Sequence, residues 1–303
     1  MSTGMNTALI TGATGYIGSN LAARLAADNW MLYLVVRPES NLNLLDSSHC
    51  DVHVRKHDGS AENLQSIISE AEPEIVFHLA GDASSVNGFV NEEKMIDSNI
   101  LFGTQLIHAM SLHHVCPIIN TETYWQHYQN HEYSPVDFYA ATKQAFRDIL
   151  RYYFETTELR VINLTLFDTY GPNDPRNKFF NYLRKTSASN TSPRFSPGNQ
   201  LLDLVFIDDV VNAYVVAASR LLSSTDKIWE DYSVNANGRL TLQQIVTKYL
   251  SLTGSNQTVD WGGIDYRPRQ IMTPWDQYER LPGWSPRISL EEGIHLMEEF
   301  ENS

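Results

Sequence analysis

The sequence predicts an α/β fold, a doubly wound parallel sheet with a smaller C-terminal lobe. In the first half, short apolar runs alternate with longer stretches whose apolar residues recur at helical spacing. Strict alternation of this kind is typical of a parallel sheet covered by helices on both faces. After Phe167 the alternation stops, and residues 168–199 are rich in Pro, Asn, Ser and Thr. This change predicts a second, smaller structural unit.

Six strands and four helices are expected before that change. The first helix carries Ile17, Leu21 and Leu25 on one face, and Pro135 directly precedes the last helix. The expected strands are Thr7–Thr11, Trp30–Val36, His53–Lys56, Glu74–Leu79, Val115–Asn120 and Arg160–Leu166. The expected helices are Gly15–Asn29, Ala61–Ala71, Glu92–His113 and Val136–Thr156.

The second half returns only partly to this pattern. A strand at Leu204–Ile207 and a helix at Val210–Leu222 continue the first unit. Helices are also expected around Lys178–Lys185, at Thr241–Thr253 and at Ser289–Phe300, with a loop over Asn256–Trp284. We therefore expect residues 1–167 with about 200–240 to form one domain. About 168–199 with 241–303 would form the smaller lobe.

Charge and composition exclude several classes of protein. The chain has 303 residues, with 22 Lys and Arg against 36 Asp and Glu, giving a net charge of −14. Such an acidic chain is a poor binder of nucleic acid, where cations must replace phosphate counterions. Cys50 and Cys116 make no disulfide framework, and we expect neither a signal peptide nor a membrane span. The expectation is a soluble cytoplasmic protein.

A glycine-rich loop joins the first strand to the first helix. Residues 11–18 read TGATGYIG, with Gly12, Gly15 and Gly18 at G-x-x-G-x-x-G spacing. Glycine permits the tight turn and lets the backbone approach a pyrophosphate, which then meets the positive end of the helix. In this strand–turn–helix context, the loop predicts a dinucleotide-binding domain of Rossmann type.

The end of the second strand indicates which dinucleotide is bound. Arg37 stands where an NAD-binding domain usually has an acid, and a guanidinium pairs well with a 2′-phosphate. This favours NADPH over NADH. The alternative is a solvated Arg37, with Glu39 holding the ribose. Asp58, after the third strand, is placed to bind the adenine amine or, alternatively, to cap the next helix.

Tyr139 and Lys143 form a candidate catalytic pair. At i and i+4 they share one helical face, so the ammonium can lower the pKa of the phenol. Tyr139 can then exchange a proton with a carbonyl or hydroxyl while hydride moves. Thr121, at the end of the fifth strand, can hydrogen-bond the same substrate oxygen.

Taken in order, these motifs resemble a known family. The segments are TGATGYIG, VFHLAG (76–81), Thr121, Tyr139 with Lys143, LFDTYGP (166–172), LDLVFIDDVVNAY (202–214) and LPGWSPRISLEEGI (281–294). The chain resembles the extended short-chain dehydrogenase/reductases, and within them the nucleotide-sugar epimerases, dehydratases and reductases. The resemblance covers nearly the whole chain.

The resemblance implies specific roles for residues. Ser84, Ser85, Thr121, Asp168 and Arg267 would contact the nucleotide sugar, with Arg267 meeting its diphosphate; Ser84 and Ser85 are alternatively turn formers, and Arg267 a surface residue. The dinucleotide contacts would be Gly12, Thr14, Gly15, Tyr16, Ile17, Gly18, Arg37, Asp58, Gly59, Leu79, Ala80, Gly81, Asn99, Tyr139 and Lys143. No metal site is expected.

More narrowly, residues 120–146 are similar to the bacterial CDP-abequose and CDP-paratose synthases. This implies NADPH-dependent reduction of the C4 ketone of CDP-4-keto-3,6-dideoxy-D-glucose, for O-antigen sugars. The run Thr121-Glu122-Thr123 lacks the second acid of the sugar-nucleotide dehydratases, which argues against dehydration.

Three other functions remain open. They are an NAD-dependent nucleotide-sugar 4-epimerase, a reductase of non-sugar carbonyls and a non-catalytic NADP-binding regulator. The resemblance also implies a homodimer, because Glu92–His113 and Val136–Thr156 look like the helix pair of a dimeric four-helix bundle in this family. The apolar residues of these helices are equally compatible with packing on the sheet.

Overall fold

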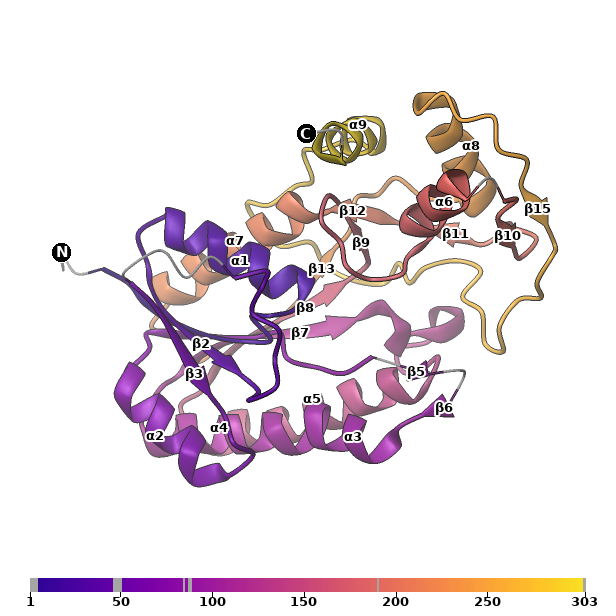
Figure 1. Cartoon of the computed structure of the whole chain (residues 1–303). Helices are drawn as coiled ribbons and strands as arrows, with labels where there is room; N and C mark the ends of the chain where they lie inside the picture. Colours follow the sequence, from indigo (N-terminus) through magenta and orange to yellow (C-terminus); the bar gives the residue numbers. More distant parts are fainter. Residues whose placement is uncertain (1–4, 46–50, 84, 87–88, 190, 302–303) are drawn as a thin grey trace.

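A seven-stranded sheet forms the centre of the molecule (Figure 1). The computed structural model describes residues 5–45, 51–83, 85–86, 89–189 and 191–301. All neighbouring strands of the sheet pair in parallel, in the order β13-β8-β7-β4-β1-β2-β3, which confirms the predicted fold class. The strands are β1 (Thr7–Thr11), β2 (Met31–Val36), β3 (Val52–Lys56), β4 (Ile75–His78), β7 (Pro117–Thr123), β8 (Arg160–Leu166) and β13 (Trp229–Val234).

Helices cover both faces of this sheet, and each face has its own hydrophobic core. In β1, Ala8 and Ile10 pack with the helices of one face, and Leu9 packs with those of the other, as the twofold alternation of a strand requires. One face is covered by α1 (Tyr16–Ala27) and α7 (Ile207–Ser223), the other by α2 (Ala61–Ala71), α4 (Phe102–Leu112) and α5 (Phe138–Thr156) (Figure 1).

The helix expected at Glu92–His113 contains an irregular turn. It begins as α3 (Glu92–Ile96), widens into a π-helical turn over Asp97–Leu101 and continues as α4. Asn99 lies in that turn with 1% of its surface exposed. Turns of this kind occur mostly at functional sites, because they re-aim a side chain without ending the helix.

The seventh strand of the sheet differs from the prediction. Leu204–Ile207 was expected to continue the main sheet. Instead, β12 (Leu204–Phe206) pairs with β9 (Asp168–Tyr170) in a separate small sheet. The edge position is taken by β13, whose sequence WEDYSV contains three polar residues, and only its second half is buried. Such a strand has no continuous apolar run, so a search for apolar runs misses it.

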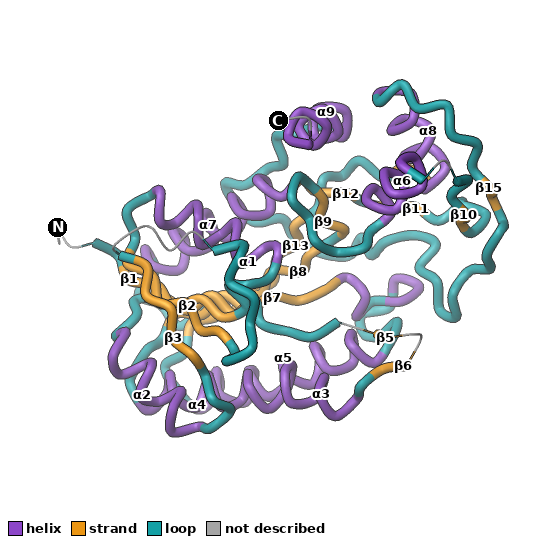
Figure 2. The backbone as a smooth tube through the Cα atoms, viewed as in Figure 1, coloured by secondary structure: helices purple, strands orange, loops and turns teal. Residues whose placement is uncertain are grey.

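The remaining elements gather beyond the carboxyl ends of β7, β8 and β13 (Figure 1). Long loops connect them, including most of residues 262–289, as the sequence predicts (Figure 2). Within the described residues, no helix combines the length and apolarity needed to span a membrane. The elements are α6 (Phe179–Ala188), α8 (Leu242–Leu252), α9 (Leu290–Glu301), β10 (Arg194–Phe195), β11 (Leu201–Leu202), β14 (Leu240–Thr241) and β15 (Asp260–Trp261); a hairpin of β5 (Ser85–Val86) and β6 (Phe89–Val90) precedes α3.

Candidate active site

The glycine loop packs too tightly for a side chain at Gly12 or Gly18. Gly12 has a φ of +73°, and a Cβ atom there would lie 2.6 Å from the backbone nitrogen of Ala80. A Cβ atom at Gly18 would lie 2.2 Å from the carbonyl oxygen of Gly12. The Gly15 amide donates to that same carbonyl at 3.0 Å. Bare backbone at the start of α1 is the arrangement that a dinucleotide pyrophosphate requires. Thr14 and Ile17, in the same loop, are partly exposed.

Tyr16 contributes its backbone to this loop, but its side chain turns away. The Tyr16 hydroxyl donates to the carbonyl oxygen of Pro172 at 3.0 Å. The guanidinium of Arg176 lies over the ring, 4.7 Å from its centroid. The phenol therefore ties the glycine loop to the segment after β9.

The predicted adenosine contacts are all at the surface. Arg37 lies 3.3 Å from Glu39, and the two side chains are 55% and 68% exposed. Asp58 is exposed and accepts hydrogen bonds from the amide and hydroxyl of Ser60, which lower the pKa of its carboxyl. The alternative role of Asp58 as a helix cap is wrong, because Ser60 caps α2. Gly59 lies in the exposed turn between them.

Beyond β4, the chain segment Leu79–Gly81 lies between the glycine loop and α5. The amides of Leu79 and Ala80 donate to Thr11. On the other side, a Cβ atom at Gly81 would lie 4.0 Å from Lys143 Nζ. Lys143 is only 3% exposed. Its ammonium therefore reaches the segment where the resemblance puts the nicotinamide ribose.

Asn99 fixes this segment against α5. Its amide nitrogen donates to the Asp82 carbonyl at 3.0 Å and to Thr142 Oγ1 at 2.8 Å. Its amide oxygen accepts from the Asp82 amide at 2.6 Å. Thr142 directly precedes Lys143 on α5. Asn99, in the π-helical turn, therefore helps to position Lys143 as well as the segment that ends at Asp82.

Burial is the main cause of the pKa shifts of Tyr139 and Lys143. Burial raises the pKa of Tyr139 to about 12, and Asp137 adds to the shift. Burial also lowers the pKa of Lys143 to about 8, which Glu122 opposes. The expectation that Lys143 lowers the phenol pKa is therefore wrong in this structure, where desolvation of the phenolate sets the direction and the opposing cation is Arg176. A raised pKa keeps Tyr139 protonated at neutral pH, as a proton donor must be.

Thr121 has a partner that the sequence analysis missed. Its hydroxyl lies 2.6 Å from the hydroxyl of Tyr214, on α7. Tyr214 is fully buried and interacts electrostatically with Tyr139. The hydroxyls of β7 and α7 therefore meet directly. Tyr214 belongs to the 202–214 motif, but only the packing of α7 on β7 brings it to Thr121.

Glu122 faces the opposite side of the sheet from Thr121. Both of its carboxylate oxygens accept from Arg147 Nη1 at 2.8 Å, and its side chain is 3% exposed. A residue one step along a strand points to the other face. Glu122, the single acid of the Thr-Glu-Thr run, is therefore held away from the Thr121 and Tyr214 hydroxyls.

The predicted substrate residues lie around an aromatic loop that follows β7. The Tyr124 hydroxyl donates to Asp168 Oδ2 at 2.8 Å. The exposed Arg267 lies with its guanidinium 4.8 Å from the centroid of the Trp125 ring. The structure thus brings Asp168 and Arg267 to neighbouring aromatic residues. Ser84 lies outside the described residues, and the side chain of Ser85 is likewise not described.

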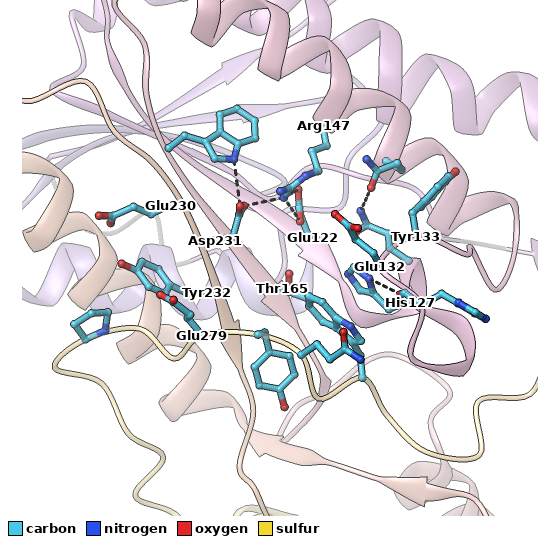
Figure 3. A pocket seen from close by; sticks show the side chains of 18 of the residues that line it. Glu122, His127, Glu132, Tyr133, Arg147, Thr165, Glu230, Asp231, Tyr232 and Glu279 are labelled. Atoms are coloured by element: carbon cyan, nitrogen blue, oxygen red, sulfur yellow. Dashed lines mark hydrogen bonds and ion pairs between the residues drawn. The ribbon is translucent and has the colours of Figure 1, made fainter.

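A polar cleft of about 1470 Å³ opens on the α5 side of β7, β8 and β13 (Figure 3). Glu122, Arg147, Thr165 and Asp231 are among its lining residues, and the catalytic candidates are not. The cleft therefore lies on the other side of β7 from the Thr121 and Tyr214 hydroxyls, and Glu122 is part of its wall.

Together, the glycine loop on a parallel sheet and Tyr139 with the buried Lys143 define a dinucleotide-dependent oxidoreductase. The family model "NAD dependent epimerase/dehydratase family" matches residues 8–230. The chain therefore belongs to this family, whose members are NAD(P)-dependent enzymes of oxidoreductase type.

Similar proteins extend over almost the whole chain. The CDP-abequose synthase of Salmonella typhimurium is 24% identical over 299 residues, covering 94% of this chain and 95% of that protein. The CDP-abequose synthase of Yersinia pseudotuberculosis is 27% identical over 281 residues, covering 90% and 93%. The crystal structure of UDP-glucose 4-epimerase with UDP-glucose from Thermotoga maritima superposes with a TM-score of 0.86 at 22% identity, covering 98% of this chain and 99% of that one.

Replacing Gly18 with alanine is expected to impair dinucleotide binding. The new Cβ would lie 2.2 Å from the Gly12 carbonyl, so the loop must shift. Overpacking of this kind costs about 1–3 kcal/mol, so we expect affinity to fall by about tenfold or more. Fluorescence titration with NADPH measures the change. Gly238→Ala, where a Cβ atom meets nothing within 4 Å, is the matched control. Equal affinities in both variants would contradict this account of the loop.

Proposed function

We propose that this protein reduces the C4 ketone of a nucleotide-linked deoxy-4-keto sugar with NADPH. CDP-4-keto-3,6-dideoxy-D-glucose is the best candidate substrate, and an O-antigen sugar the product. The proposal is carried by the Tyr139–Lys143 pair on α5 together with the Thr121–Tyr214 hydroxyl contact, with Glu122 held on the other face of β7. The similarity to CDP-abequose synthases supports the choice of sugar nucleotide.

In this mechanism the residues supply the proton and orient the ketone. The bound cofactor supplies hydride to C4. Thr121, held by Tyr214 at 2.6 Å, donates a hydrogen bond to the ketone oxygen. Tyr139 gives its proton to that oxygen as it becomes an alkoxide, so hydride and proton together convert the ketone to an alcohol. Lys143 stabilises the charge left on the phenolate and contacts the ribose.

The binding residues are assigned by the same proposal. Arg37 would pair with the 2′-phosphate, Asp58 with the adenine, and Arg267 with the sugar-nucleotide diphosphate. Asp168, Ser84 and Ser85 would contact the sugar. We also propose the division into a dinucleotide domain (1–167 with about 200–240) and a substrate lobe (about 168–199 with 241–303).

A homodimer is part of the proposal. Leu101, Leu112 and Tyr152, on or beside α4 and α5, are 48%, 51% and 63% exposed. Large apolar side chains at this exposure favour a partner surface. A second copy of the chain docking on α4 and α5 would cover them.

A nucleotide-sugar 4-epimerase is the second candidate. The observation in its favour is the exposed Glu39, which lies next to Arg37 and can hold a ribose diol. The similar structure from Thermotoga maritima is that of a UDP-glucose 4-epimerase. Epimerases of this family keep tightly bound NAD. Dinucleotide released from denatured purified protein would therefore favour this candidate.

The nucleotide base is tested by thermal unfolding. With NADPH present, we expect CDP to raise the midpoint more than UDP, GDP or dTDP at equal concentration. A ligand at about 100 times its Kd stabilises the folded state by roughly 2.7 kcal/mol, which is enough to rank the bases. A larger shift with another base would keep the reductase but reject the CDP sugar. No shift with any base would reject nucleotide sugars as substrates.

The Tyr139→Phe variant tests whether the protein is an enzyme or a non-catalytic dinucleotide-binding protein. Loss of the proton donor is expected to lower turnover of the 4-keto sugar by about 10²–10⁴-fold. NADPH consumption at 340 nm measures turnover, and NADPH fluorescence measures binding, which we expect to be retained. A variant with unchanged turnover would show that the proton comes from another group.

Arg37→Ala tests the choice of cofactor. Hydrogen bonds to a charged phosphate are worth about 1.5–3 kcal/mol, so NADPH should bind roughly 10–100-fold more weakly. NADH affinity should be unchanged. Arg24→Ala removes another exposed arginine, paired with Asp28 on α1, and serves as control. An equal loss for both dinucleotides would contradict the assignment of Arg37 to the phosphate.

A further inference from the structure

Tyr214 is a core residue of α7, on the face of the sheet that α7 covers (Figure 1). Its side chain is fully buried, and its ring centroid lies 6.4 Å from that of Phe77 on β4. Ala213 and Ala217, beside it on α7, are also fully buried, and such small side chains let a helix pack closely on a sheet. Close packing of this kind fixes the position of the Tyr214 hydroxyl, 2.6 Å from Thr121 Oγ1.

The direction of the hydrogen bond between these two hydroxyls follows from their surroundings. Within the described part of the chain, the Tyr214 hydroxyl has no hydrogen-bond partner other than Thr121. If Thr121 donated the bond, the Tyr214 proton would be buried in the hydrophobic core without an acceptor, which is unfavourable. Burial also raises the pKa of Tyr214, so this proton is present at neutral pH. Tyr214 is therefore the donor, and Thr121 Oγ1 is the acceptor.

This direction leaves the proton of Thr121 available for another acceptor. A threonine hydroxyl carries one proton and two acceptor lone pairs. Because Tyr214 donates to one lone pair, the Thr121 proton must point away from Tyr214. Thr121 is partly exposed, whereas Tyr214 is fully buried, so the open side of the pair is the side of Thr121. The two residues thus form a chain of donors that begins in the core and ends at the Thr121 proton.

We propose that Tyr214 is a positioning residue that holds Thr121 as a hydrogen-bond donor toward the reacting oxygen of the substrate. This inference rests on the proposed function, in which Thr121 meets a ketone. A ketone oxygen accepts hydrogen bonds and donates none, so a hydroxyl held in advance as a donor is matched to it. As hydride arrives, the oxygen gains negative charge and the bond from Thr121 becomes stronger. Without Tyr214, the Thr121 hydroxyl is free to rotate.

The direction of the bond is tested by thermal unfolding, without any substrate. Thr121→Val removes the acceptor and leaves the Tyr214 proton buried and unpaired. Adding Tyr214→Phe removes that unpaired group, so the double variant should unfold at a higher temperature than Thr121→Val alone. With Thr121 present, the same Tyr214→Phe change should lower the midpoint, because it removes a hydrogen bond. A fall of similar size in both backgrounds would overturn the proposal.

A second substitution covers the case in which Thr121→Val does not fold by itself. Folding of the double variant Thr121→Val/Tyr214→Phe would then give the same answer, since it shows that the unpaired Tyr214 hydroxyl was the cause. Thr121→Ala, with and without Tyr214→Phe, repeats the comparison with a smaller side chain. A Tyr214→Phe change that fails to stabilise the protein in both of these backgrounds counts against the proposal.

The positioning role is tested by turnover of the 4-keto sugar. Tyr214→Phe should lower kcat by roughly 2–10-fold, the equivalent of one neutral hydrogen bond, and should change KM less, because the bond is strongest when the oxygen is charged. Thr121→Val should lower kcat by more, and adding Tyr214→Phe to it should cause no further loss. A purely structural role predicts the same loss in both backgrounds. That additive result, or an unchanged kcat in Tyr214→Phe, would reject the positioning role.

Tyr249→Phe is the matched control. Tyr249, on α8, is 4% exposed, and its hydroxyl donates to Glu298 Oε1 at 3.0 Å, so this variant also loses one buried phenol hydroxyl. We expect it to lower the unfolding midpoint without changing kcat. A loss of kcat equal to that of Tyr214→Phe would show that reduced stability explains both, and would reject the positioning role.

The two experiments separate this inference from the proposed function. If no 4-keto sugar is reduced, the proposed function and the positioning role are both rejected, and the unfolding comparison still decides the direction of the Tyr214–Thr121 bond. If the sugar is reduced and the losses in kcat are additive, the proposed function stands and the positioning role is wrong.

Discussion

The twofold alternation of one strand, β7, organises the site. Thr121 points to the α7 side and meets Tyr214, while Asn120 and Glu122 point to the α5 side and meet Asn163 and Arg147. The two sides differ in charge. One side carries the Thr121 and Tyr214 hydroxyls, and the other holds the Glu122–Arg147 ion pair. A register shift of one residue would exchange them, so the parallel pairing of β7 with β4 and β8 fixes both arrangements at once.

The fold class was predicted correctly because its signal is local. The β–α alternation follows from runs of consecutive residues. The glycine loop and the Tyr139–Lys143 pair are also read from a few consecutive residues, and their roles stay predictions. Strand β13 was missed because an edge strand lacks an apolar run. Tyr214, Arg147 and the Tyr16–Pro172 bond were missed because each joins segments that are distant in sequence and become neighbours only when the sheet forms. The π-helical turn at Asn99 was missed because apolar spacing does not distinguish it from a regular helix.

Burial has opposite effects on Tyr139 and Lys143, and this difference suits the reduction that we propose. The same loss of solvent raises the phenol pKa and lowers the ammonium pKa, because it disfavours whichever form is charged. In the proposed reaction Tyr139 would hold its proton until a strong base forms, and an alkoxide at C4 is such a base whereas a neutral ketone is not. Proton transfer would thereby be tied to the arrival of hydride.

The proposed reaction also requires that no other base reach the substrate. A carboxylate beside the ketone would compete for the proton. Glu122, which follows Thr121 directly in the chain, lies on the far face of β7, where both of its oxygens accept from Arg147 at 2.8 Å. The alternation of the strand therefore separates the acid of the Thr-Glu-Thr run from the side on which we propose that the ketone lies.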